Sequence, residues 1–344
     1  MSIRVYTALT SGLAKAAEEG RKLEALGFDG VVSNETTHDP FLPLAVVAQN
    51  TRRLRIQTSV AVGFARSPMI LANLAHDLNA FSGGRFTLGL GSQIKPHITR
   101  RYSMPWSSPA ARMREMVQAI RAIFADWYDG QKLDFEGEFY THTLMPPLFR
   151  PENIEHGKPP INVAAVGPLM TETAGAVADG MIVHPFSTEA YMRQHTLPRL
   201  QAGLASAGRA RQDCGVAYPP FMVTGATEEI FRKCREAVAK RIAFYASTPA
   251  YRPVLEQHGW GDLQTELTRM TKEGRWSEMD ALIDDDILNT FAVVGEVKDI
   301  APEIWSRFGD IVQEFTISSE TVDMETLARI AADLRTLARR PVVS

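Results

Sequence analysis

Short apolar segments alternate with helical segments along almost the whole chain, and this alternation constrains the fold more than any other feature. Eight strands are predicted, at Ile3–Leu9, Gly30–Glu35, Leu54–Val62, Phe86–Leu90, Ile161–Ala165, Gly180–His184, Val216–Val223 and Ile311–Ile317. The intervening segments, such as Pro68–Phe81 and Met324–Arg339, have apolar residues at helical spacing. Because the strands are apolar on both faces, they indicate a parallel sheet covered by helices.

Eight strand-helix repeats predict an α/β fold of the (β/α)8 TIM-barrel type. The rival is a doubly wound open sheet, but the first strand is not followed by a glycine-rich phosphate turn. Residues 1–344 are interpreted as a single domain with insertion segments at about 92–108, 130–160 and 247–290. These insertions follow strand four, precede strand five and follow the helix after strand seven.

Composition excludes several classes of protein. The chain has 344 residues and a net charge of −3, which gives no support for nucleic-acid binding. Two cysteines cannot form a disulfide framework or a four-cysteine zinc site. No apolar run reaches the roughly 18–20 residues of a membrane span, and the N-terminus has no signal-peptide pattern. We therefore expect a cytoplasmic protein without a membrane or nucleic-acid partner.

The active site of such a barrel lies where the strands end at their carboxyl side. The residues there are mostly apolar, with scattered hydrogen-bonding groups and without the clustered His, Asp and Glu of metal sites. Helix starts after two of the strands offer backbone N–H groups to an anion. The pattern favours an aromatic, phosphate-bearing organic cofactor and no metal.

The Gly89-x-Gly91 pair does not fit a dinucleotide-binding fingerprint. The third glycine position is Ile94, no helix begins there, and no suitable acid follows the expected strand. A Rossmann-type site is therefore not predicted.

Two segments carry a resemblance to a known family. RSPMILANLAHDLNAFSGGRFTLGLGS resembles the block of bacterial-luciferase-like monooxygenases in which a helix precedes SGGR and a glycine-rich strand end. INVAAVGPLMTETAGAVADG resembles their fifth strand and phosphate-binding turn. The resemblance covers nearly the whole chain and is nearest to an actinobacterial, mycobacterial-type branch. It implies an oxidoreductase that uses coenzyme F420, a deazaflavin, for hydride transfer to or from a small organic substrate.

The resemblance also implies which residues bind the cofactor. Related deazaflavin enzymes carry a non-prolyl cis peptide in a bulge of strand three, which corresponds here to Ser59–Val60. The turn Gly167–Thr171 corresponds to the phosphate site at a helix N-terminus. The full set of implied cofactor-binding residues is Ser59, Val60, Gly91, Ser92, Gln93, Arg101, Tyr102, Ala164, Ala165, Gly167, Pro168, Met170 and Thr171.

The acid–base residue does not carry over directly. The family's histidine after the strand-two acid is replaced by Thr36, and the glutamate that some deazaflavin dehydrogenases place beyond the strand-four glycine is replaced by Ile94. His38 and His97 are the nearest substitutes, since histidine suits proton transfer near neutral pH. Glu35 is the third catalytic candidate, as a ligand of the cofactor or as a residue that orients a histidine.

Aromatic residues near the strand ends suggest an apolar substrate pocket. The candidates are Phe64, Trp106, His184, Tyr218 and Phe221. Among relatives, homodimers and separate cofactor reductases occur, so both are expected partners besides the small-molecule substrate.

Three alternatives remain open at the level of sequence. The first is a two-component monooxygenase that uses reduced FMN. The second is a non-catalytic flavin-binding relative, which the Thr36 and Ile94 departures support. The third is a barrel lyase or hydrolase with a phosphorylated substrate, although no lysine stands at a strand end for Schiff-base chemistry.

Overall fold

The computed structural model describes residues 3–339, and its main sheet is a parallel barrel. The strand order is β3-β2-β1-β13-β10-β9-β8-β5-β4, and β3 also pairs with β5. The predicted (β/α)8 TIM barrel is therefore confirmed. Contacts divide the chain into two compact units, which are described separately below. Unit 1 holds the N-terminal end to Tyr6, Val183–Pro198 and the chain from Val216 onward, and unit 2 holds Thr7–Ile182 and Arg199–Gly215.

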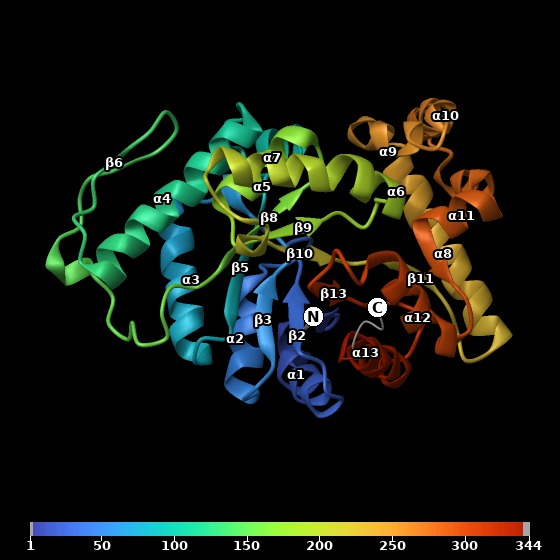
Figure 1. Cartoon of the computed structure of the whole chain (residues 1–344), viewed down its shortest axis with the longest axis horizontal. Helices are drawn as coiled ribbons and strands as arrows, with labels where there is room; N and C mark the ends of the chain where they lie inside the picture. Colours follow the sequence, from blue (N-terminus) through green and yellow to red (C-terminus); the bar gives the residue numbers. More distant parts are fainter. Residues whose placement is uncertain (1–2, 340–344) are drawn as a thin grey trace. The chain divides into compact units, whose positions relative to one another are not determined.

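Unit 2 contains the first half of the strand-helix repeats (Figure 1). Its strands are β2 (Gly30–Ser33), β3 (Arg55–Thr58), β4 (Ala61–Val62), β5 (Phe86–Gly91) and β8 (Ile161–Ala165), and its hairpin is β6 (Phe135–Glu136) with β7 (Thr141–His142). Its helices are α1 (Ala16–Ala25), α2 (Phe41–Asn50), α3 (Pro68–Ser82), α4 (Pro109–Asp129), α5 (Pro168–Val177) and α7 (Leu197–Ser206). The strands β1 (Arg4–Ala8) and β9 (Gly180–Val183) span points where the chain passes from one unit to the other.

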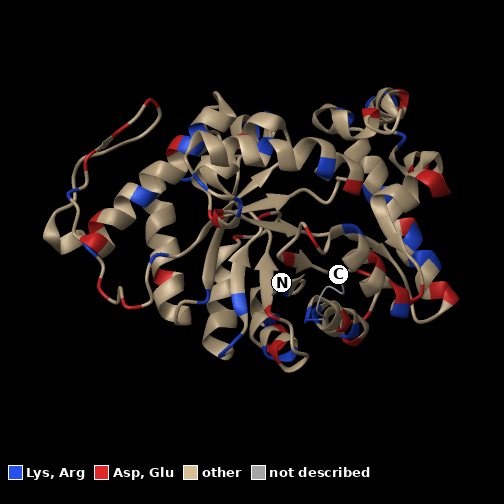
Figure 2. Ribbon diagram, in the orientation of Figure 1, with Lys and Arg blue, Asp and Glu red and all other residues tan. Residues whose placement is uncertain are grey.

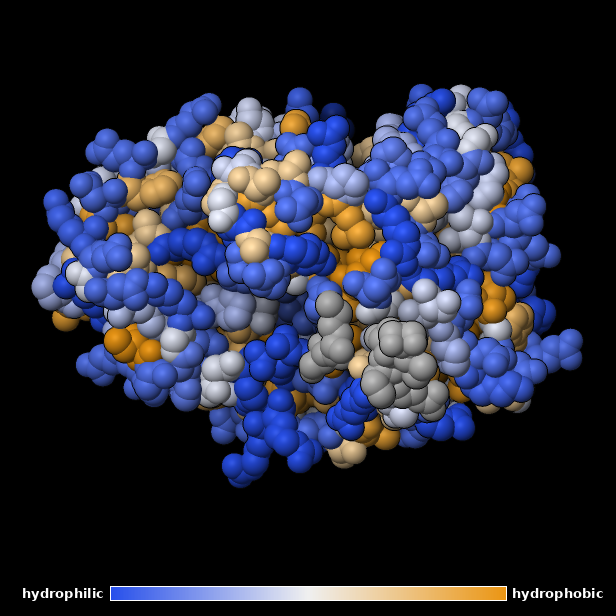
Figure 3. All heavy atoms as spheres, in the orientation of Figure 1, coloured by the Kyte–Doolittle hydropathy of each residue, from blue (hydrophilic) through white to orange (hydrophobic). Residues whose placement is uncertain are grey.

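Unit 1 contains the last strands and a second small sheet. Its strands are β10 (Gly215–Tyr218), β11 (Phe221–Val223), β12 (Ala292–Val294) and β13 (Glu314–Thr316). Its helices are α6 (Glu189–Tyr191), α8 (Glu228–Ala246), α9 (Arg252–Glu256), α10 (Gly261–Lys272), α11 (Asp285–Phe291), α12 (Val297–Phe308) and α13 (Met324–Arg339). Residues of α8, α9, α10 and α11 share one buried apolar cluster with Phe186, Phe221 and Ala292, so the 247–290 insertion packs on the rest of unit 1. Charged residues of both signs occur along α8, and the surface around α10 is mainly hydrophilic (Figures 2 and 3).

Several elements match their predicted bounds because local signals define them. The helix α3 begins where Ser67 accepts a hydrogen bond from the N–H of Ile70 and Pro68 occupies the first turn. It ends at Gly83, whose φ of 70° is the left-handed conformation that glycine adopts readily. The predicted strand Ile161–Ala165 and the predicted helix Met324–Arg339 also agree with β8 and α13.

Other predicted boundaries were wrong. The strand Leu54–Val62 is divided into β3 and β4, and the strand Val216–Val223 is divided into β10 and β11, which pairs with β12 in a separate sheet. Pro219 and Pro220 separate these last two strands, because proline lacks the N–H that a ladder needs. The helix predicted over Thr37–Gln49 begins only at Phe41, where Asp39 caps its first N–H groups.

The other differences concern local helix geometry. The segment predicted to be helical from Leu13 starts with a 3-10 turn, Leu13–Lys15. The helix predicted over Thr188–Ala207 consists of α6, a π-helical turn at Met192–Thr196, and α7, which contains Pro198 near its start. The 92–108 loop, predicted to lack a period, contains a π-helical turn at His97–Arg101. Within residues 3–339, no helix is both long and apolar enough to cross a membrane.

Candidate functional site

The break between β3 and β4 forms one wall of the candidate cofactor site. The Ser59–Val60 peptide bond is cis, as the family resemblance predicts. The backbone of β5 packs closely behind it: a Cβ on Gly89 would lie 1.9 Å from the Thr58 carbonyl oxygen, and one on Gly91 would lie 2.5 Å from Val60 Cγ2. Both positions therefore require glycine. This spacing brings three of the predicted cofactor residues, Ser59, Val60 and Gly91, together.

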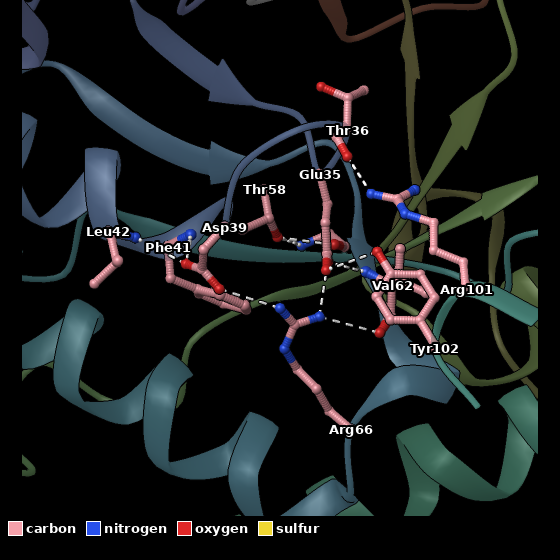
Figure 4. A network of polar contacts seen from close by, with 11 residues as sticks. Glu35, Thr36, Asp39, Phe41, Leu42, Thr58, Val62, Arg66, Arg101 and Tyr102 are labelled. Carbon is pink, nitrogen blue, oxygen red and sulfur yellow. Dashed lines mark hydrogen bonds and ion pairs between the residues drawn. The ribbon is translucent and has the colours of Figure 1, made fainter. Parts of the chain in front are cut away.

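A buried carboxylate connects this wall to the neighbouring loops (Figure 4). Glu35 has a side chain only 7% exposed. Its Oε2 accepts from the N–H of Val62 at 2.7 Å and from Arg66 Nη1 at 2.7 Å. Its Oε1 accepts from the Tyr102 hydroxyl at 3.1 Å. Since both oxygens are engaged, the geometry assigns Glu35 to holding these segments in place, and its predicted catalytic role stays a prediction.

Arg66 joins Glu35 to the start of α2. Its Nη2 lies 3.2 Å from Asp39 Oδ2, and the other Asp39 oxygen accepts from the N–H of Phe41 at 2.8 Å and of Leu42 at 3.1 Å. Burial by itself would lower the pKa of Arg66, but the hydrogen bond to Glu35 and the charges of Glu35 and Asp39 outweigh it, so the pKa is raised. The guanidinium therefore stays charged.

The predicted loop residues Arg101 and Tyr102 both reach the loop after β2. Arg101 Nη2 donates to the Thr36 carbonyl oxygen, and its guanidinium carbon lies 5.1 Å above the Tyr102 ring. Burial, followed by the charge of Glu35 and the hydrogen bond to it, raises the pKa of Tyr102. These two contacts hold the 92–108 loop against the residues that follow β2.

The two residues after Gly91 lie at the turn into that loop. The Ser92 hydroxyl donates to the Gln93 carbonyl oxygen at 3.1 Å. Gln93 has a φ of 57°, in the left-handed region that non-glycine residues adopt rarely. Strained backbone of this kind is common at ligand sites, which agrees with their predicted place in the cofactor site.

The predicted phosphate turn lies at the start of α5. A Cβ on Gly167 would meet nothing within 4 Å, and no side chain caps the helix. Thr171, only 3% exposed, donates through its hydroxyl to the Gly167 carbonyl oxygen at 3.0 Å. The remaining predicted members of this group are Ala164 and Ala165 at the end of β8, and Pro168 and Met170 in the first turn. The first turn contains no acidic residue, so its N–H groups and dipole are available to an anion.

The two candidate acid–base histidines are both exposed. His38 lies in the loop before α2, and His97 begins the π-helical turn of the 92–108 loop. Asp39, rather than His38, caps α2. Among the described residues, neither imidazole ring has a hydrogen-bond partner, and the choice between the two histidines stays a prediction.

Two of the predicted substrate residues meet in unit 2. The rings of Phe64 and Trp106 are 5.8 Å apart in an edge-on arrangement, and Phe64 is fully buried. The guanidinium of Arg112 lies 4.6 Å above the Phe64 ring. Arg112, Arg66 and Asp39 had no predicted role in the site. The sequence does contain an indication that Arg112 is buried, because Arg112 shares the helical spacing of the buried residues Met116 and Ile120.

The other three predicted substrate residues lie in unit 1. His184 Nδ1 accepts from the N–H of Phe186 at 3.0 Å, its Nε2 lies 3.1 Å from the Tyr251 hydroxyl, and burial lowers its pKa to about 4. The Tyr218 hydroxyl donates to the Ser187 carbonyl oxygen at 3.1 Å, and Phe221 is 6% exposed. Their part in a substrate pocket stays a prediction. Among residues 3–339, no group of three His, Cys, Asp or Glu side chains could hold a metal ion.

Comparison with known proteins adds three similarities. The family model described as luciferase-like monooxygenase matches residues 3–309. An uncharacterised protein of Mycobacterium tuberculosis is 50% identical over 310 residues, covering 90% of this chain and 91% of the relative. A putative coenzyme F420-dependent oxidoreductase of the same organism is 26% identical over 312 residues, covering 86% and 88%.

A solved structure has the same fold. The coenzyme F420-dependent tetrahydromethanopterin reductase of Methanopyrus kandleri superposes with a TM-score of 0.78 at 20% identity. The match covers 97% of this chain and 98% of that one. The similarity therefore extends over both units.

Proposed function

Because the chain belongs to the luciferase-like monooxygenase family, we propose that it is an oxidoreductase that binds coenzyme F420 and transfers a hydride to or from a small organic substrate. The observation that carries the proposal is the open start of α5 at Gly167, within the same unit as the closely packed wall of Ser59, Val60 and Gly91. The putative F420-dependent oxidoreductase, similar over most of its length, supports the choice of cofactor.

The residues present fit a flat, phosphate-bearing cofactor. Gly91 has no side chain and lets the side chain of Val60 pack directly on β5, which leaves this wall without a projecting residue at Gly91 and suits it to a planar ring. Gly167 leaves the approach to α5 free of side-chain atoms, and a phosphate there is favoured by the helix dipole. When bound, coenzyme F420 supplies a ring carbon that carries or accepts the hydride.

The chain's own residues contribute positioning and proton transfer. Glu35, Arg66 and Tyr102 fix the loops after β2, β4 and β5 relative to one another. His38 and His97 are exposed, and their imidazole rings have no hydrogen-bond partner among the described residues. We therefore propose that one of them exchanges the substrate proton. Replacement of the responsible histidine with glutamine lowers the turnover rate about 10²-fold or more without weakening cofactor binding. Unchanged turnover in both single variants and in the double variant would exclude both residues.

A cofactor titration tests the central proposal. We expect the purified chain to quench the fluorescence of coenzyme F420 with a micromolar or lower dissociation constant and to bind FMN much more weakly. The reverse order would favour the FMN-dependent monooxygenase, and binding of neither would remove the proposal. Activity confined to small hydrophilic substrates would count against the expected apolar substrate.

Gly167 and Gly215 provide a matched pair of variants for the phosphate turn. Both lie in unit 2, and a Cβ on Gly215 would meet only the Asp179 carbonyl oxygen at 3.9 Å. Gly167→Val is expected to weaken coenzyme F420 binding at least tenfold while circular dichroism stays unchanged, whereas Gly215→Val leaves binding intact. Equal binding by the two variants would remove Gly167 from the phosphate site.

A further inference from the structure

Arg112 is a buried arginine whose partners are all neutral. It lies in the first turn of α4 and is 7% exposed. Its Nε donates to the Tyr140 hydroxyl at 2.9 Å, and its Nη1 donates to the Pro105 carbonyl oxygen at 2.7 Å. The rings of Phe64 and Tyr140 lie 4.6 Å and 5.7 Å from the guanidinium carbon. No carboxylate within the described residues forms an ion pair with it.

The acid nearest to Arg112 along the helix is already occupied. Glu115 accepts hydrogen bonds from three N–H groups at the tip of the β6–β7 hairpin, those of Glu138, Phe139 and Tyr140, at 2.9, 2.6 and 2.7 Å. These bonds hold the hairpin beside α4 and fix Tyr140 next to the guanidinium. The hairpin therefore shapes the surroundings of Arg112 without supplying it with a negative charge.

A guanidinium in this setting retains a strong capacity to bind an anion. It has five N–H donors, and only two of them have a partner in residues 3–339. Buried charges are normally paired, because removing an ion from water without a counter-charge is costly. The start of α4 adds positive potential at the same end, since Ser108 makes no side-chain cap bond and the first turn has no acidic residue.

We propose that Arg112 binds an oxyanion, a carboxylate or a phosphate, of a small organic ligand. Arginine suits this chemistry because its planar fork donates two parallel hydrogen bonds to such a group. Trp106, which is partly exposed and packs on Phe64, supplies an apolar surface beside it. The oxyanion belongs either to the substrate or to the phosphate tail of the cofactor, and this assignment to a source rests on the proposed function.

Direct binding of simple probes tests the site without turnover. Benzoate, its neutral analogue benzamide and inorganic phosphate are titrated calorimetrically into the full chain. We expect an oxyanion to bind the unmodified chain and to lose about tenfold or more of its affinity in Arg112→Met, while the affinity for benzamide does not change. Arg112→Lys keeps a point charge and is expected to fall between the two.

Arg121 provides the matched control on the same helix. It is paired with Asp179 at 2.8 Å and with the Val177 carbonyl oxygen, so Arg121→Met is expected to leave oxyanion binding unchanged. Circular dichroism and thermal unfolding establish that each variant folds. If Arg112→Met and Arg121→Met bind all probes and the cofactor as the unmodified chain does, Arg112 only joins segments of the protein and the proposal is wrong.

A second titration distinguishes the two sources of the oxyanion. Coenzyme F420 is compared with its deazaflavin riboside, which lacks the phosphate tail. Weaker binding of the coenzyme but not of the riboside in Arg112→Met assigns the site to the cofactor tail, whereas loss of benzoate binding alone assigns it to the substrate. If the unmodified chain binds neither deazaflavin but still prefers benzoate to benzamide through Arg112, the proposed function fails and the oxyanion site stands.

Discussion

Arg66 and Arg112 both lie in unit 2 with the guanidinium over a phenylalanine ring. They differ in that Arg66 has carboxylate partners and Arg112 has only neutral ones within residues 3–339. The guanidinium of Arg66 lies 5.4 Å from the Phe41 ring, and that of Arg112 lies 4.6 Å from the Phe64 ring. Arg66 pairs with two carboxylates, Glu35 at 2.7 Å and Asp39 at 3.2 Å. Arg112 is bonded only to a hydroxyl and a carbonyl oxygen.

The pairing of Arg66 with two carboxylates indicates a structural role, whereas the lack of a carboxylate partner for Arg112 in the described part of the chain suits it to binding an anionic ligand. The charge of Arg66 is neutralised within the protein, and its bonds join the loop after β2, the start of α2 and the turn after β4. The charge of Arg112 is not neutralised by the described residues, although it also joins a loop, a helix and a hairpin. Removal of the two side chains should therefore affect stability very differently.

The largest expected effect is on the stability of the Arg66 variant. Arg66→Met leaves the carboxylate of Glu35 buried without its counter-charge, which costs about 3–5 kcal/mol of unfolding free energy. Arg112→Met leaves no charged partner and relieves a buried charge, so its cost is expected to stay below about 1.5 kcal/mol. Urea unfolding of both variants measures the difference. Equal losses would mean that Arg112 is as structural as Arg66.

The next largest expected effect is the coupling free energy between Glu35 and Arg66 in unfolding experiments. Glu35→Gln alone leaves Arg66 with a weaker partner, and Arg66→Met alone leaves Glu35 charged and unpaired. The double variant removes both charges, so its destabilisation should be smaller than the sum of the single losses by about 1–3 kcal/mol. A double-mutant cycle in urea measures this coupling. Additive losses would show that the 2.7 Å contact contributes little.

Much of the fold could be predicted because its determinants are local in sequence. Ser67, Pro68 and Gly83 mark both ends of α3, and Pro168 marks the start of α5. The division of the strand Leu54–Val62 was not predicted, although the resemblance did place the cis peptide at Ser59–Val60. Periodicity reports which residues are apolar, and it does not report where hydrogen bonding between strands is interrupted.

The candidate site was predictable only in part for the same reason. Residues that depend on their backbone position, Gly91 and Gly167, could be placed from the motif. The partners of Glu35 could not, because Arg66 and Tyr102 lie 31 and 67 residues away and the contacts depend on how the loops fold. Arg112 was missed because a buried arginine without an acidic partner becomes informative only once its surroundings are known.

A smaller loss of stability is expected when the carboxylate at the start of α2 is removed. Asp39 is 39% exposed, and its carboxylate both caps α2 and contacts Arg66. Asp39→Ala removes the cap and a partly solvated ion pair, for an expected loss of about 1 kcal/mol. Thermal unfolding at two salt concentrations separates these contributions, because salt screens the ion pair more than the cap. A loss as large as that of Arg66→Met would make Asp39, rather than Glu35, the main partner.

The smallest expected effect is the dependence of stability on Tyr102 at high pH. The folded state raises the pKa of Tyr102 above its usual value of about 10, through burial first and then through the charge and hydrogen bond of Glu35. Between the unfolded and folded pKa values the folded chain holds the extra proton, so this part of the stability is present below pH 10 and is lost as the pH rises through the folded pKa.

Other tyrosines titrate in the same range, and the readout is therefore the difference between the unmodified chain and Tyr102→Phe in urea unfolding from pH 9 to 11. We expect that difference to shrink with rising pH, and to shrink less in a Glu35→Gln background, where the negative charge facing the phenol is absent. A difference that is constant over this range, with or without Glu35, would mean that Tyr102 does not sense the carboxylate, and the Glu35 network would then consist of Arg66 and the backbone alone.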